Sequence, residues 1–282
     1  MDSFLQIIRT NISVGLNKPV KLFQISDMHM ACLDNESSEI DINDHKRFHK
    51  QWDKLKRDFA KEANELCDER YDIEPNLIFE RLIDRAIELG SNAIVLSGDI
   101  FDRITDSNIR YYKDLVAKIP IPIIYCPGNH DWINESGERK NQYDRVKEIV
   151  KNPECDSFDL GELTVVTIDN GMKIITDKQL DFLKQSLSEK KHILLVLHAP
   201  LNIGKSGKEL ASILSTYFLQ GVDGDCGNAF EFNRLVEENA GKIVAVLAGH
   251  IHRFYEGEIT GNLKQYTTSS GLIAAGREII IE

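Results

Sequence analysis

Five short apolar runs along the chain each end abruptly at a group of polar residues. Each run has the length and composition of a buried β-strand. The run at 93–97, for example, stops at a Gly-Asp turn that places Asp99 and Asp102 beyond its end. Because ligands of open α/β sheets bind beyond the carboxyl ends of the strands, the pattern predicts a site at one sheet edge. The runs are residues 20–25, 93–97, 122–126, 192–197 and 242–247.

A second pattern, with apolar residues every three or four positions, predicts helices between these strands. The longest covers residues 45–70, a charged segment whose apolar stripe includes Phe48 and Trp52, after an acidic loop at 33–45. This helix either packs on the flank of the fold or forms a lid or partner-binding element beside the site, and the pattern does not distinguish these alternatives. The other predicted helices are residues 75–90, 107–118, 177–188, 209–219 and 228–239.

Strand-like segments also occur towards both ends of the chain. Residues 4–14 and 20–25 are predicted to form a strand pair, because a segment with Gly, Asn and Pro separates them. Strands that alternate with helices indicate a layered α/β fold. No linker or repeat divides the sequence, so residues 1–282 are predicted to form one domain with a charged helical insert at about 33–75. Further strands are predicted at 163–168, 255–260, 265–269 and 278–281.

Composition limits the partners and the location that we expect. The net charge of −11 opposes a broad nucleic-acid surface, because phosphate neutralisation needs clustered Lys and Arg. The five cysteines are scattered without Cys-x-x-Cys spacing, which predicts free thiols in a reducing compartment. The sequence has neither a typical signal-peptide start nor an apolar run of the ~20 residues that span a membrane. We therefore expect a cytoplasmic protein that binds neither membranes nor nucleic acid.

The polar residues that follow the strands are of the kinds that bind transition metals. Asp27 and His29 are two residues apart, as are His250 and His252, and in extended backbone that spacing directs both side chains of a pair to the same side. Imidazole and carboxylate ligands without cysteine favour Mn, Fe, Zn, Co or Ni. Seven candidate ligands exceed the need of one ion and indicate two ions that share a carboxylate. The candidates are Asp27, His29, Asp99, Asn129, His198, His250 and His252.

Five motifs of the chain, in this order, resemble those of the calcineurin-like metallophosphoesterase superfamily. They are Asp27-x-His29, Gly98-Asp99-x-x-Asp102, Gly128-Asn129-His130-Asp131, the lone His198 and Gly249-His250-x-His252. The resemblance implies a four-layer α/β/β/α sandwich in which helices flank two mixed β-sheets. It also implies that two metal ions, with Mn, Fe or Zn as the favoured elements, hydrolyse a phosphate ester through a bridging hydroxide.

The resemblance also implies a role for each residue of the motifs. Asp99 would bridge the two metals, and His130 would be the general acid that protonates the leaving group, with Asp102 as its orienting carboxylate. Arg103 is similar to a phosphate-gripping arginine, with an ordinary salt-bridge arginine as the alternative, while Asp131 is expected to be structural. The first metal would be held by Asp27, His29, Asp99 and His252, and the second by Asp99, Asn129, His198 and His250.

Phosphodiesters are favoured over phosphomonoesters as substrates, because no basic or recognition insert indicates a protein substrate. The alternative hypothesis is a non-catalytic scaffold of the same fold that binds a protein partner. The segment from Ala199 to Ser206 resembles a relaxed phosphate-binding loop, but Ala199 replaces the first glycine and Pro200 lacks an amide N–H. Lys205 and Lys208 could contact the substrate from a rim of the site. The sequence does not determine the oligomeric state.

Overall fold

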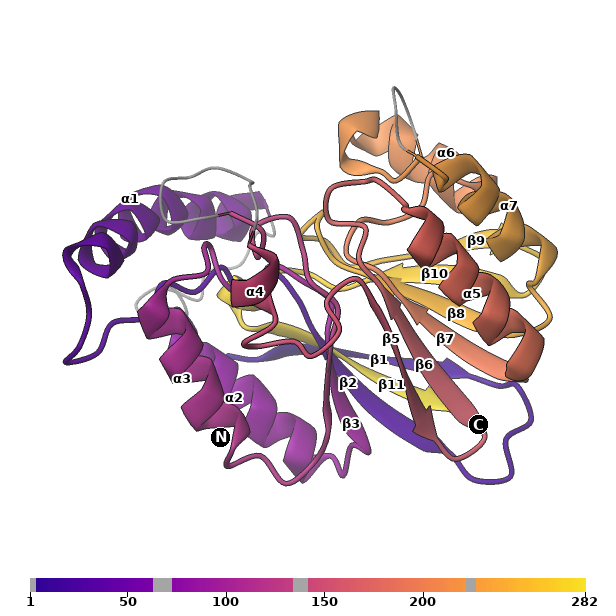
Figure 1. Cartoon of the computed structure of the whole chain (residues 1–282), viewed down its shortest axis with the longest axis horizontal. Helices are drawn as coiled ribbons and strands as arrows, with labels where there is room; N and C mark the ends of the chain where they lie inside the picture. Colours follow the sequence, from indigo (N-terminus) through magenta and orange to yellow (C-terminus); the bar gives the residue numbers. More distant parts are fainter. Residues whose placement is uncertain (1–3, 63–72, 134–141, 222–226) are drawn as a thin grey trace.

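The computed structural model describes residues 4–62, 73–133, 142–221 and 227–282, and two mixed β-sheets form its centre (Figure 1). In the five-stranded sheet, β2, β3 and β4 are parallel, and β11 pairs antiparallel with β2 and parallel with β1. The strand order is β1 (Gln6–Ile12), β11 (Ala275–Ile281), β2 (Val20–Ile25), β3 (Ala93–Leu96) and β4 (Ile123–Tyr125).

The six-stranded sheet has a parallel centre and two antiparallel edge strands. Strands β6, β7, β8 and β10 are parallel, while β5 and β9 close the sheet on either side. The order is β5 (Cys155–Leu160), β6 (Leu163–Ile168), β7 (His192–Val196), β8 (Ile243–Ala248), β10 (Leu263–Thr267) and β9 (Tyr255–Thr260). In both sheets the parallel strands direct their carboxyl ends to one edge, so polar residues that follow them meet there.

Alternating side chains along the strands build three apolar layers between four layers of structure. Leu22 and Val95 of one sheet pack against Leu194 and Ala245 of the other, which forms the core between the sheets. The outer face of the five-stranded sheet packs on α2 (Pro75–Glu88) and α3 (Asp106–Val116), and that of the six-stranded sheet on α5 (Asp177–Glu189) and α7 (Ala229–Glu238). The predicted four-layer sandwich is confirmed.

The remaining helices lie outside these two helical layers. Helix α1 (Glu39–Glu62) lies beside the polar edge of the five-stranded sheet, and α6 (Gly204–Ile213) contacts β9. A short α4 (Tyr143–Val146) and two 3₁₀ turns, Thr216–Phe218 and Gly271–Ile273, complete the described elements. Among the residues that the structure describes, no helix combines the length and apolar character needed to cross a membrane.

The predicted pairing of the first two strands and the predicted start of the first helix were wrong. The segments at 4–14 and 20–25 do not pair, because the C-terminal strand β11 inserts between them, a long-range pairing that no local pattern reveals. Helix α1 begins at Glu39 rather than 45, since Ser38 and Asp41 cap it reciprocally: the Ser38 N–H donates to Asp41 at 2.8 Å and the Asp41 N–H to the Ser38 hydroxyl at 3.2 Å.

The structure also differs from the predicted elements around α6, β5 and α4, and it describes three of the five cysteines. The helix predicted at 209–219 is wrong in both bounds, because α6 begins at Gly204, and strand β5 and helix α4 were not predicted. Residues 63–72 of the predicted long helix lie outside the described residues. Of the five cysteines, Cys32, Cys126 and Cys155 are free thiols, while Cys67 and Cys226 lie outside the described part. One domain with a helical insert stays a prediction.

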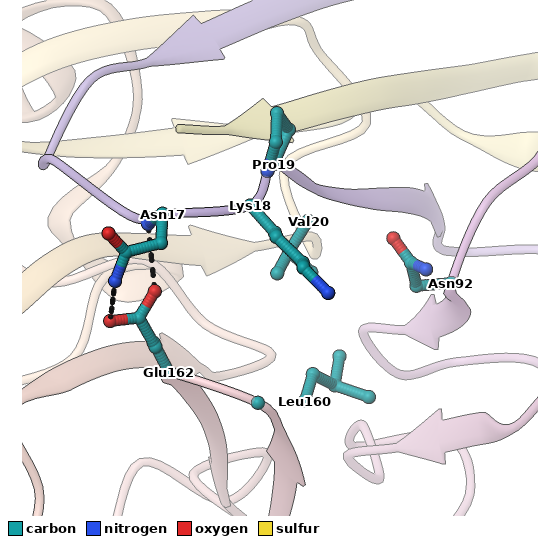
Figure 2. Close-up of a pocket in the computed structure, with 8 residues that line it drawn as sticks. Asn17, Lys18, Pro19, Val20, Asn92, Leu160 and Glu162 are labelled. Carbon is teal, nitrogen blue, oxygen red and sulfur yellow. Dashed lines mark hydrogen bonds between the residues drawn. The ribbon is translucent and has the colours of Figure 1, made fainter.

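Polar contacts tie the two sheets together at both ends. The buried Gln24 amide of β2 donates to the Ser97 hydroxyl and to the Ala248 carbonyl of the other sheet, each at 2.9 Å. At the opposite end, Asn17 donates its backbone and side-chain N–H groups to the Glu162 carboxylate at 2.8 Å (Figure 2). This pair borders an open pocket of about 520 Å³ in which Lys18 also lies. The relative position of the sheets is thus fixed by hydrogen bonds as well as by packing.

The inter-sheet core should dominate stability, which a matched pair of leucine substitutions tests. Leu194 is fully buried between the sheets, whereas Leu77 of α2 is 49% exposed. We expect Leu194→Ala to lower the free energy of unfolding by about 2–5 kcal/mol, because it leaves a cavity. Leu77→Ala should change it by less than about 0.5 kcal/mol. Urea unfolding followed by circular dichroism measures both, and equal losses would contradict the assigned core.

Candidate metal centre

Five of the seven candidate ligands have left-handed backbone conformations. The φ angles are 55° at Asp27, 46° at His29, 53° at Asp99, 68° at His250 and 50° at His252. The extended backbone expected for the pairs Asp27/His29 and His250/His252 is therefore wrong. Left-handed backbone costs of order 1–3 kcal/mol at a non-glycine residue, and such strain gathers at functional sites. The strand ends turn sharply here, and the turns direct the side chains into the site.

The first donor group joins the end of β2 to the loop after β8. His252 Nε2 lies 3.2 Å from Asp27 Oδ1, and 3.2 Å from His29 Nε2. Burial would raise the pKa of the Asp27 carboxyl, but the charge and hydrogen bond of His252, together with the charge of His198, outweigh burial and lower that pKa to about 2. Burial, together with the charge of His130, holds the pKa of His29 well below its usual value. A neutral imidazole and an ionised carboxylate are the forms that bind metals.

The second donor group collects side chains from both sheets around His198. Its Nε2 lies 3.2 Å from Asp99 Oδ2, 3.2 Å from Asn129 Oδ1 and 3.1 Å from His250 Nδ1. Burial and the charge of His198 lower the pKa of His250 to about 3, so this imidazole is neutral at neutral pH. Within each group, three ligating atoms lie within 4.8 Å of one another. The two groups are neighbours, because the Asp27 carboxylate accepts the His250 backbone N–H.

The arrangement around His198 calls for a positive charge at its centre. The Ser97 carbonyl can only accept, so the Nδ1 of His198, at 2.8 Å, carries a proton and donates it. In the neutral ring, Nε2 therefore carries a lone pair, which faces the oxygens of Asp99 and Asn129 and the Nδ1 of His250. Burial opposes protonation, yet the charges of Asp99 and Asp27 and the hydrogen bonds with Asp99 and the Ser97 carbonyl together outweigh it and raise the pKa of His198 to about 10. A proton or a metal cation satisfies these lone pairs, and the nitrogen and oxygen donor set suits a transition metal.

His130 lies beside the first donor group and contacts the carboxylate that was predicted to orient it. Its Nδ1 is 3.2 Å from Asp102 Oδ1, and its ring meets the His29 ring edge-on at 4.6 Å between centroids. The buried Asp102 also accepts from Arg47 and, at 3.1 Å, from the Trp52 indole N–H. Asp102 therefore connects the predicted general acid to helix α1.

Arg103 forms an ion pair with helix α1. Its Nε lies 3.3 Å from Asp44 of α1, and burial together with Arg47 lowers the pKa of its guanidinium. It is not among the residues that line the pocket described below. The salt-bridge alternative describes the contact that Arg103 makes, and its role in phosphate binding stays a prediction.

Buried polar residues hold the loops that carry the ligands. Asp131 accepts the backbone N–H groups of Asp99 at 2.9 Å, Phe101 at 3.2 Å and Gly128 at 2.8 Å, which fits the structural role predicted for it. Asn170, which the sequence did not single out, accepts the His198 backbone N–H at 2.9 Å. Asp131 thus joins the loops after β3 and β4, and Asn170 joins the loops after β6 and β7.

The donor groups open onto a pocket of about 240 Å³. Three side chains that sequence reasoning missed form its walls: Trp52 from α1, Lys173 from the loop after β6, and Phe218 beside His250. None carried a signal, because each is one apolar or charged residue within an ordinary helix or loop. Lys205, by contrast, is 3.9 Å from Glu209 on the surface of α6 and does not line this pocket. The pocket residues are His29, Trp52, Asp99, Asn129, His130, Gly171, Lys173, Phe218, His250 and His252.

Metal-dependent phosphoesterases place two metal ions and a proton donor around one phosphoryl group, and the side chains collected at this pocket are of the kinds that such sites use. A family model described as calcineurin-like phosphoesterase matches residues 20–254, so the chain belongs to the calcineurin-like phosphoesterase family. The match covers all five motifs, from Asp27 to His252.

Individual proteins give weaker but consistent similarity. "Probable glycerophosphodiester phosphodiesterase GpdQ" of Arcobacter nitrofigilis is 22% identical over 178 residues, which cover 57% of this chain. The matched region spans 56% of that relative, little more than half its length. A dimetal phosphatase from Danio rerio has a TM-score of 0.54 at 11% identity, with 91% of each chain covered. Purple acid phosphatase PPD1 from yellow lupin seeds has a TM-score of 0.53 at 13% identity, over 92% of this chain and 45% of that one. These two structures share the fold.

The close approach of loops at Gly128 yields a test of the donor geometry. A Cβ atom there would lie 2.5 Å from the Asp99 nitrogen and 2.8 Å from His198 Cε1, so both ligands would have to move. We expect Gly128→Ala to weaken metal binding by about 10–100-fold, as measured by calorimetric titration with Mn²⁺. Gly241→Ala is the matched control, because a Cβ there meets nothing within 4 Å. Equal affinities in the two variants would contradict the assigned geometry.

Proposed function

We propose that this chain hydrolyses small phosphodiesters with two bound metal ions. The observation that carries the proposal is that both donor groups and His130 face one pocket. A volume of about 240 Å³ favours a small ester over a large substrate, since pockets for drug-sized ligands measure ~300–1,000 Å³. The relative described as a glycerophosphodiester phosphodiesterase supports a diester.

The seven candidate ligands divide between two metal sites in this proposal. Asp99 is the shared carboxylate in this proposal, because it contacts His198 of the second group and its charge also acts on His29 of the first. Bound Mn, Fe or Zn would supply an activated water as nucleophile and neutralise the charge on the phosphoryl oxygens. The first site consists of Asp27, His29, Asp99 and His252, and the second of Asp99, Asn129, His198 and His250.

His130 is the proposed general acid for the departing alcohol. Its Nδ1 is held by Asp102 at 3.2 Å, which leaves Nε2 for the leaving-group oxygen. A histidine in this position gains most when the leaving group is a poor one, because a strongly basic alkoxide needs a proton as it leaves. Asp102 contributes by fixing the ring orientation and by stabilising the imidazolium.

A comparison of two chromogenic substrates tests the reaction and its preference. We expect the purified chain with Mn²⁺ to hydrolyse bis(p-nitrophenyl) phosphate at a higher kcat/KM than p-nitrophenyl phosphate, and a chelator to abolish both activities. A monoester preference would contradict the diester assignment. With two metals confirmed by mass spectrometry, the absence of both activities would contradict the proposal and favour the non-catalytic scaffold.

Substitutions at the shared ligand and at the acid should separate binding from proton transfer. Asp99→Asn should remove both metals and nearly all activity, because a neutral amide cannot bridge two cations. His130→Asn should retain both metals and lose about 10²–10⁴-fold in kcat on an ester with a poor leaving group. Metal content and kcat are measured on the same preparations. If His130→Asn emptied the site, the acid assignment would be wrong.

A further inference from the structure

Helix α1 holds one aromatic side chain directly against the candidate metal centre. Phe48 and Trp52 are both buried and pack with Ala31 and Leu272, which fastens this face of the helix to the fold. Trp52 is among the residues that line the pocket, and Phe48 is not. The helix therefore does more than cover the flank of the five-stranded sheet, since it supplies a wall of the site.

The Trp52 ring packs on three of the histidines around the pocket. It stacks on His29 with 4.1 Å between centroids and an interplanar angle of 22°, and its centroid lies 6.1 Å from that of His130 and 6.2 Å from that of His252. A flat ring stacked on an imidazole restricts its rotation, because neighbouring atoms fill the space into which it would turn.

The indole N–H of Trp52 is directed at the same carboxylate that holds the proposed general acid. It donates to Asp102 Oδ1 at 3.1 Å, and the His130 Nδ1 lies 3.2 Å from that same oxygen. Arg47, five residues earlier in α1, donates to the other carboxylate oxygen, Oδ2. Asp102 is 1% exposed, so protein donors take the place of water around it. Helix α1 thus supplies two of the side-chain donors that fix this carboxylate.

We propose that Trp52 is a positioning residue for catalysis: its N–H fixes Asp102, and Asp102 fixes His130 towards the leaving group. The inference rests on the proposed general-acid role of His130. Packing with Phe48 and Leu272 requires only an apolar side chain, whereas the contact with Asp102 requires an N–H donor. The hydrogen bond needs the indole nitrogen, and it needs α1 to be seated on the site.

The test uses a substitution that keeps the ring and removes the donor. Trp52→Phe retains an aromatic ring on His29 but has no N–H for Asp102. Two aryl diesters that differ in their leaving groups report on the acid: bis(p-nitrophenyl) phosphate with a good one, and diphenyl phosphate with a poor one. We expect Trp52→Phe to lose about tenfold more kcat/KM on diphenyl phosphate than on the nitrophenyl ester, with unchanged metal content. Lys50→Ala, an exposed position of the same helix, is the control and should lose nothing.

A double-mutant cycle shows whether Trp52 acts through Asp102. In an Asp102→Asn background, Trp52→Phe should cost nothing further on diphenyl phosphate. Additive losses, or equal losses on both esters in the single variant, would overturn the inference and leave Trp52 as a packing residue.

The contact itself can be observed without turnover. The chain has two tryptophans, so a ¹⁵N-labelled sample gives two indole N–H signals, and the one lost in Trp52→Phe belongs to Trp52. That signal should move in Asp102→Asn, and an unmoved signal would overturn the inference even if the enzyme is active. If the signal moves but the metal-loaded wild-type chain hydrolyses neither ester, the contact stands, and the proposed function and the catalytic role of Trp52 both fail.

Discussion

Lone pairs from two sheets are crowded into one small volume, and positive charge is what makes this crowding tolerable. Around His198, a carboxylate, an amide oxygen and a second imidazole converge on a nitrogen that has no proton to offer when the ring is neutral. The other features of the site follow from the need to hold such groups together. Left-handed backbone at five ligand positions, close contacts at Gly128 and the buried Asp131 all restrain groups that would otherwise repel one another.

Sequence reasoning succeeded where a local pattern and a long-range constraint coincide. Each predicted ligand follows a buried strand, and parallel strands must end at one edge, so the motifs from Asp27 to His252 could be placed together without knowing the full topology. It failed where the outcome depends on partners distant in sequence. Strand β11 comes to lie between β1 and β2, and nothing within residues 4–25 reveals that a segment some 250 residues later will separate them.

The sequence predicted the reactive residues of the site, but it did not predict the side chains that form the walls of the pocket. Asp, His and Asn residues at strand ends can be recognised as metal ligands from their chemistry. In the sequence, by contrast, Trp52 is one apolar residue of an amphipathic helix and Lys173 is one lysine of a loop. Of the two alternatives for the long helix, the structure supports a place beside the site, because Trp52 and Arg47 both contact Asp102. Arg103 shows the opposite case: its motif position was informative, but the structure pairs it with Asp44.

The amide of Gln24 has a consequence that extends beyond the core in which it lies. It binds the hydroxyl of Ser97, two residues before Asp99, and the carbonyl of Ala248, two residues before His250. One neutral side chain thus sets the distance between the strand ends that carry ligands from the two sheets. The separation of the two sheets therefore also sets the distance between the ligands that come from one sheet and those that come from the other. Core substitutions that moved the sheets apart would change the distances between the ligands and slow the reaction, although every ligand residue would still be present. The core and the metal centre are therefore expected to change together when the sequence changes.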